Sequence, residues 1–178
     1  MKKQQKKTKT RWHRLLGKLL EELLVPVGIS VYTEVPVTVE PPKTDVLLLG
    51  REGSEWTAEQ AERLPDGIRG SRAKHILLEF KYTESINKNA ISQTLCYEFF
   101  YRRTQKLDED EAQIFLISSK TPRKAVLEKA GYYATDQKGV YKSSDFLLEA
   151  IPILVLNELS DEMHNAFIKC FASRKKAK

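Results

Sequence analysis

The sequence feature that most constrains the fold is residues 75–82, where an apolar run ends in charged and aromatic side chains. This segment reads His-Ile-Leu-Leu-Glu-Phe-Lys-Tyr, a composition typical of a largely buried β-strand. A long segment with helical spacing, residues 86–106, follows after a short connection. A strand that leads directly into a helix indicates an α/β domain.

The rest of the chain extends this pattern. Apolar spacing and turn residues predict helices at residues 12–24, 122–130 and 161–173, and strands at residues 29–39, 45–49, 113–118 and 151–156. The polar residues 51–74 predict a surface loop with one helical turn near residues 57–63. The order of elements predicts one α/β domain over residues 12–173, with a central mixed sheet flanked by helices and basic flexible tails at residues 1–11 and 174–178.

Composition excludes several classes of protein. Of the 178 residues, 41% are hydrophobic and 30% charged, which is enough apolar material for a folded domain. No apolar run approaches the ~18 residues of a membrane span, so we expect neither an integral membrane protein nor a membrane partner. Cys96 and Cys170 lie far apart and the N-terminus shows no cleavage site for a leader, which favours a reducing cytoplasm over secretion.

Basic residues are concentrated at the two ends of the chain. Residues 1–18 contain eight Lys and Arg and no acid, and residues 174–178 contain four more. Together these exceed the formal net charge of +6, so the body between them is acidic. The tails are compatible with solvated solubility elements or with non-specific attraction to phosphates, and the acids of the body with a bound divalent cation.

Glu79, Phe80 and Lys81 form the most informative tripeptide. Side chains two residues apart on a strand point to one face, so Glu79 and Lys81 are neighbours while Phe80 points to the other face. Two charges beside an apolar run are unfavourable unless they are paired or bind something. Asp45 begins the preceding strand, and two carboxylates with the Phe80 carbonyl can present hard oxygen ligands to Mg²⁺. A lysine beside such a metal can orient or deprotonate an attacking water, which predicts metal-assisted phosphodiester hydrolysis.

These residues resemble the PD-(D/E)xK nuclease superfamily. The core of that superfamily is αβββαβ, the restriction-endonuclease-like fold, with an Asp on the second strand and (D/E)-x-K on the third. Asp45, Glu79 and Lys81 match these positions over roughly residues 12–118, although Lys43 and Thr44 separate the prolines from the Asp. The resemblance implies a Mg²⁺- or Mn²⁺-dependent nuclease acting on DNA. Its metal ligands would be Asp45, Glu79 and Phe80, and Lys81 would activate water.

The helix over residues 86–106 adds further candidates. Gln93 shares a helical row with Tyr97, and the resemblance implies that Gln93 orders the site; a glutamine at the edge of the core is the alternative. Basic residues interleaved with tyrosines on the same helix predict contacts to nucleic-acid phosphates and bases, or a solvated face. These residues are Tyr97, Arg102, Arg103 and Lys106.

The resemblance also implies one more acid from the first helix. Glu22 flanks the leucine stripe of residues 12–24, whereas Glu21 points away from it, so Glu22 is the preferred candidate. Glu34, on the face of its strand opposite the valines, is the alternative. Each of them is also compatible with a surface carboxylate.

Two functions remain open from the sequence. The first is the nuclease, and the second is a non-catalytic module of the same fold that binds nucleic acid or a protein, in which the charged cluster only stabilises strand ends. Either is compatible with a homodimer.

A second match to the tripeptide pattern, Asp136-Gln137-Lys138, lies in an expected turn. Scattered histidines, and the absence of a glycine-rich phosphate loop or a Gly-x-Ser-x-Gly elbow, exclude zinc hydrolases, kinases and serine esterases.

Overall fold

The computed structural model describes residues 42–48 and 55–173. The chain divides into two units, Met1–Pro41 and Pro42–Lys178, and the fold below is that of the described part of the second. The helix expected at residues 12–24 and the strand expected at residues 29–39 lie outside the described residues, as do the candidate acids Glu21, Glu22 and Glu34.

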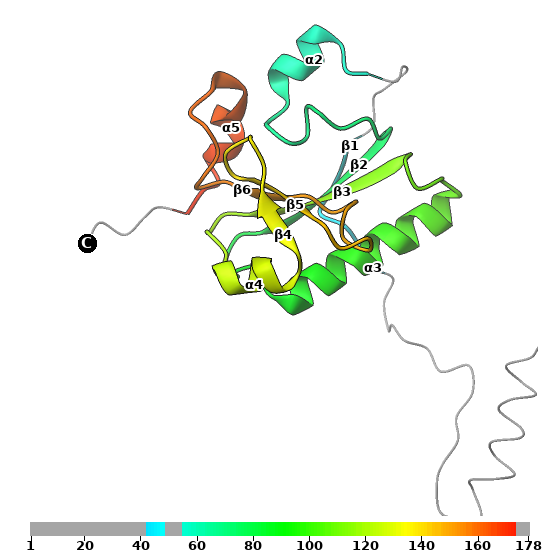
Figure 1. Ribbon diagram of the computed structural model, residues 1–178. Helices are drawn as coiled ribbons and strands as arrows, with labels where there is room; N and C mark the ends of the chain where they lie inside the picture. Colours follow the sequence, from blue (N-terminus) through cyan, green and yellow to red (C-terminus); the bar gives the residue numbers. More distant parts are fainter. Residues whose placement is uncertain (1–41, 49–54, 174–178) are drawn as a thin grey trace, which may run out of the picture. The chain divides into compact units, whose positions relative to one another are not determined.

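Six strands of the described residues form one mixed sheet in the order β1-β2-β3-β6-β5-β4 (Figure 1). In chain order they are β1 (Val46–Leu48), β2 (His75–Lys81), β3 (Ala112–Ser118), β4 (Tyr132–Ala134), β5 (Val140–Ser143) and β6 (Ile153–Val155). Strands β2, β3 and β6 are parallel, β1 pairs antiparallel with β2, and β5 pairs antiparallel with both β4 and β6. The predicted mixed sheet is confirmed.

Helices cover both faces of this sheet. They are α2 (Ala58–Arg63), α3 (Lys88–Gln105), α4 (Lys124–Lys129) and α5 (Ala166–Lys169), with the 3₁₀ helix η2 (Met163–Asn165) directly before α5. Figure 1 shows α3 and α4 on one side of the sheet and α2 and α5 on the other. None of the helices in the described residues is long and apolar enough to cross a membrane. The predicted α/β class with helices flanking the sheet is confirmed.

The core is split into two layers by the alternation of side chains along the strands. On β2, Ile76 packs into the cluster that includes Ile168 of α5, while Leu77 packs into the cluster that includes Ile91 of α3. The central strand β3 is buried at almost every position. Strands buried on both faces have near-continuous apolar sequences, which is why these segments are recognisable in the sequence.

The C-terminal segment differs from its prediction. The sequence predicts a continuous helix over residues 161–173, but the structure has only η2 and the four-residue α5. Met163 and Phe167 are exposed, so the segment lacks a wide buried stripe, and a short helix is marginal without such packing. The side chain of Asn165 instead donates a hydrogen bond to Asp66, 99 residues earlier in the chain.

Strands β4 and β5 are not predicted by the sequence. They flank the turn expected around Asp136, and they have three and four residues with several exposed side chains. Strand β4 pairs with β5 and β5 with β6, so these strands depend on neighbours in the sheet rather than on an apolar pattern of their own.

Candidate active site

The candidate site lies at the carboxyl end of β2, on the face covered by α3. Leu77 packs against α3, and with two-residue periodicity Glu79 and Lys81 point to the same face. The Lys81 Nζ donates a hydrogen bond to Glu79 Oε1 at 2.9 Å. The sequence prediction that these two side chains are neighbours is confirmed.

Glu79 is a buried carboxylate that is only half bonded. Its exposed fraction is 4%, and within the described residues its Oε2 atom has no hydrogen-bond partner. Burial raises the pKa of this carboxyl, the Lys81 hydrogen bond and charge oppose the rise, and the charge of Asp45 adds to it. A buried oxygen without a donor is unfavourable, so Oε2 is a position where a cation or a donor group would be stabilised.

Asp45 joins the site from the edge of the sheet. It directly precedes β1, and its Oδ2 accepts a hydrogen bond from the backbone N–H of Phe80 at 2.7 Å. Since the N–H and C=O of one strand residue point to the same side, the Phe80 carbonyl faces the side of β2 on which Asp45 lies. The predicted oxygen donors Asp45 and Phe80 are therefore placed together.

Helix α3 supplies the next contacts of Lys81. The Lys81 Nζ donates to Gln93 Oε1 at 3.0 Å, and Gln93 Nε2 donates to the Tyr97 hydroxyl at 2.5 Å. Each link fixes the orientation of the next, from the tyrosine to the amide and from the amide to the ammonium group. Gln93 is an exposed residue that contacts the lysine of the tripeptide, and its ordering role stays a prediction.

The three basic residues predicted to contact nucleic acid from the end of α3 are not brought to this site. Helix α3 runs antiparallel to β2, because Lys81 at the end of the strand contacts Gln93 while His75 at its start lies 2.8 Å from the hydroxyl of Tyr101 (Nδ1 to Oη). The basic residues at the C-terminal end of α3 therefore lie near the start of β2, at the opposite end of the strand from Glu79. These are Arg102, Arg103 and Lys106.

Arg102 is already paired within the helix. Its guanidinium forms an ion pair with Glu98, one turn earlier, and its side chain is 19% exposed. A charge that is matched and largely covered is a poor phosphate ligand, whereas Arg103 and Lys106 are exposed. The acid at position 98 was the sequence signal for this pairing, since residues four apart on a helix are neighbours.

The oxygen donors at β2 suit a cation that keeps most of its water. Among the described residues, no group of three or more His, Cys, Asp or Glu side chains is arranged to hold a metal ion. Mg²⁺ does not need such a cage, because it is usually held by one or two carboxylates and retains several waters. Asp45 and Glu79 could supply two such carboxylates: Glu79 Oε2 is unbonded among the described residues, while Asp45 Oδ2 accepts from the Phe80 N–H.

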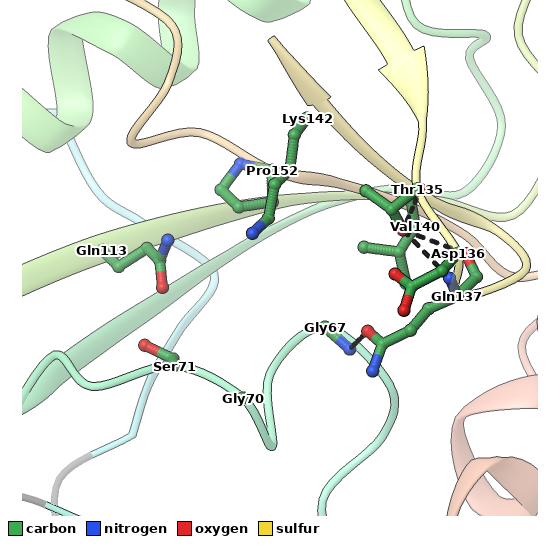
Figure 2. Close-up of a pocket in the computed structure, with 10 residues that line it drawn as sticks. All are labelled: Gly67, Gly70, Ser71, Gln113, Thr135, Asp136, Gln137, Val140, Lys142 and Pro152. Carbon is green, nitrogen blue, oxygen red and sulfur yellow. Dashed lines mark hydrogen bonds between the residues drawn. The ribbon is translucent and has the colours of Figure 1, made fainter.

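The second match to the tripeptide pattern lies elsewhere. Asp136 and Gln137 are in the turn between β4 and β5 and line a pocket of about 250 Å³, shown in Figure 2. Gln137 Oε1 accepts a hydrogen bond from the backbone N–H of Gly67 at 3.0 Å, so this side chain fastens a loop. The expected turn is confirmed.

Sequence reasoning missed a polar cluster around Asp66. One carboxylate oxygen accepts from His164 Nε2 at 2.8 Å, and the other accepts from Asn165 Nδ2 at 2.8 Å and from Ser160 Oγ at 3.1 Å. Burial alone would raise the pKa of Asp66, but these hydrogen bonds together lower it. The partners come from nearly a hundred residues away in the chain, and no local pattern could have indicated them.

No protein-family model, curated protein or solved structure matches this chain. Its function must therefore be inferred from its own residues.

Proposed function

We propose that this protein is a Mg²⁺-dependent nuclease that hydrolyses phosphodiester bonds of DNA. The observation that carries the proposal is the buried, half-bonded carboxylate of Glu79, with Lys81 bonded to one oxygen and nothing among the described residues bonded to the other. A buried carboxylate oxygen without a partner is unfavourable, and a bound cation would relieve that cost.

The surrounding fold supports a restriction-endonuclease-like core. The strand preceded by Asp45 pairs antiparallel with β2, and β2 is followed by the long helix α3 and the parallel strand β3. This is the order of the second strand, third strand, helix and fourth strand in the PD-(D/E)xK superfamily. In this proposal Asp45, Glu79 and Lys81 would correspond to the Asp and the (D/E)-x-K of that superfamily.

Each residue has a role that follows from its contacts. Asp45 and Glu79 would hold the metal, with the Phe80 carbonyl on the same side of β2. When bound, Mg²⁺ would stabilise negative charge on the phosphate during hydrolysis. The Lys81 ammonium has three N–H donors, of which Glu79 and Gln93 accept two, and the third is left to orient a water or a phosphate oxygen. Tyr97 positions Gln93, which in turn positions Lys81.

The competing function is the non-catalytic binding module. It is favoured by the fact that Glu79 and Lys81 already form an ion pair that would stabilise the end of β2 without any metal. The two functions predict different effects of Mg²⁺ on the melting temperature. A ligand that binds the native state raises its melting temperature by mass action, and a purely structural ion pair gives no such rise.

The test is cleavage of labelled single-stranded, double-stranded and branched DNA with Mg²⁺ or Mn²⁺. We expect Lys81→Ala and Asp45→Asn to lower the cleavage rate by about 100-fold or more. Glu84→Gln, an exposed acid just beyond β2, is the matched control and should cleave like the wild type. Folded protein that cleaves none of the three substrates, or full activity in both site variants, would overturn the proposal.

A further inference from the structure

Three aromatic rings gather at the end of β2, on the opposite face from Glu79. The ring of Phe80 lies 5.9 Å from that of Tyr82 and 5.9 Å from that of Phe171, centroid to centroid. Tyr82 is 57% exposed and Phe171 53% exposed. Single exposed aromatic residues are common, but exposed rings clustered in one patch are typical of an interaction site.

Phe80 anchors the other two rings to the fold. It is partly buried and packs against the core cluster that contains Ile117 and Leu156. Its plane makes angles of 54° with Tyr82 and 80° with Phe171, so neither ring is stacked face to face on it. The exposed parts of both rings are therefore not covered by a stacked neighbour within this trio.

The backbone that carries the rings is held through one buried residue. Ser119 donates from its hydroxyl to the carbonyl of Tyr82 at 2.5 Å and from its N–H to the carbonyl of Lys81 at 3.1 Å. Its own carbonyl accepts from the N–H of Ser173 at 2.9 Å, two residues after Phe171. Ser119 thus ties both ring-bearing segments to the end of β3, and a surface held in this way loses little entropy on binding.

Positive charge accompanies the rings. Lys120 is exposed, and its Nζ donates a hydrogen bond to the backbone carbonyl of Thr83 at 2.5 Å. Thr83 directly follows Tyr82 in the chain. Downstream of Phe171 the sequence continues with Arg174, Lys175, Lys176 and Lys178. Exposed aromatic rings with neighbouring cations match the chemistry of unpaired nucleotides, whose bases stack and whose phosphates carry charge.

We propose that Tyr82 and Phe171 form a base-stacking platform for single-stranded nucleic acid. The inference rests on the proposed nuclease function for its link to cleavage, because the rings lie at the same end of β2 as Lys81, on the opposite face of the strand. A paired base inside a duplex is not open to such rings, whereas an unpaired base presents both of its faces. The substrate class is therefore single-stranded DNA, or the unpaired part of a branched molecule.

The test measures binding without cleavage. The full-length protein is titrated in EDTA into labelled oligothymidine and into a matched duplex, and into a single strand carrying 2-aminopurine, whose fluorescence falls on stacking. We expect tighter binding to the single strand. Tyr82→Ala and Phe171→Ala should each weaken it by about 5- to 100-fold and remove the fluorescence quenching. Tyr82→Phe should retain both, because it keeps the ring.

Tyr133→Ala is the matched control, since Tyr133 is similarly exposed on β4, at the other edge of the sheet. The platform proposal is overturned if the ring variants fold and bind like the wild type. It is also overturned if the protein prefers duplex, or if this surface binds only a protein. The two proposals fail separately. Stacking without metal-dependent cleavage would remove the nuclease function alone, and cleavage with unchanged ring variants would remove the platform alone.

Discussion

A buried carboxylate at Glu79 is unfavourable for stability, whereas the proposed function needs that carboxylate to bind a cation. Its pKa is raised on folding because burial disfavours the charged form. We therefore expect Glu79→Gln to change the free energy of unfolding in urea by no more than about 1 kcal/mol, and to abolish the rise in melting temperature that Mg²⁺ causes in the wild type. Glu84→Gln should retain that rise. An equal response to Mg²⁺ in Glu79→Gln would mean that the cation binds elsewhere.

Tyr97 offers a test of positioning at the same scale. Its hydroxyl accepts from Gln93, which would otherwise be free to rotate away from Lys81. Tyr97→Phe removes one hydrogen bond at a partly exposed site, so we expect the cleavage rate at saturating substrate to fall by about 2- to 10-fold. The melting temperature should change little. Tyr133→Phe serves as the control, and a rate in Tyr97→Phe equal to that of the wild type would show that Gln93 holds its place unaided.

The site residues were predictable from the sequence where their geometry is local. Glu79 and Lys81 are fixed as neighbours by the two-residue repeat of a strand. Asp45 could be picked out by its place before an apolar segment, but its contact with Phe80 comes from the pairing of β1 with β2. Whether Glu79 Oε2 has a hydrogen-bond partner depends on the packing around that one atom, which the amino-acid sequence does not reveal. The Asp66 cluster was missed for a related reason, because its partners are distant in the chain.

At the scale of elements, the buried strands β2 and β3 were predictable from the sequence, whereas the short strands β4 and β5 were not. Strands β2 and β3 are apolar along nearly their whole length, and α3 follows a clear helical spacing. Strand β4 pairs with β5, which pairs with β6, and in the C-terminal segment Asn165 bonds to Asp66, 99 residues earlier in the chain. Tertiary contacts overrode local preference in both places.

The Asp66 cluster joins the loop before β2 to η2 and should have a measurable pH dependence. The pKa of Asp66 is lowered on folding, so its carboxylate contributes stability that is fully present above the unfolded value of about 3.8 and is lost as the pH falls through the lower folded value. We expect Asp66→Asn to destabilise the protein by about 1–3 kcal/mol at pH 7. The difference from the wild type should shrink below pH 4.

Urea unfolding at a series of pH values measures this effect. Asp136→Asn, an exposed acid in the turn between β4 and β5, is the control and should match the wild type throughout. A constant difference between Asp66→Asn and the wild type from pH 7 to pH 3 would show that the cluster acts through packing rather than through charge.

At the scale of the whole molecule, charge and aromatic surface should contribute to nucleic-acid binding in separable ways. A variant with Gln at positions 174, 175, 176 and 178 lacks the basic residues that follow Phe171 in the sequence. We expect its logarithmic salt dependence of single-strand binding to become shallower by about 0.7 for each phosphate that the variant no longer neutralises, with 2-aminopurine quenching retained. Tyr82→Ala should do the reverse, because stacking releases no counterions: the affinity falls by the same factor at every salt concentration and the slope is unchanged. Parallel shifts of slope in both variants would mean that the rings and the tail do not act on different parts of the nucleotide.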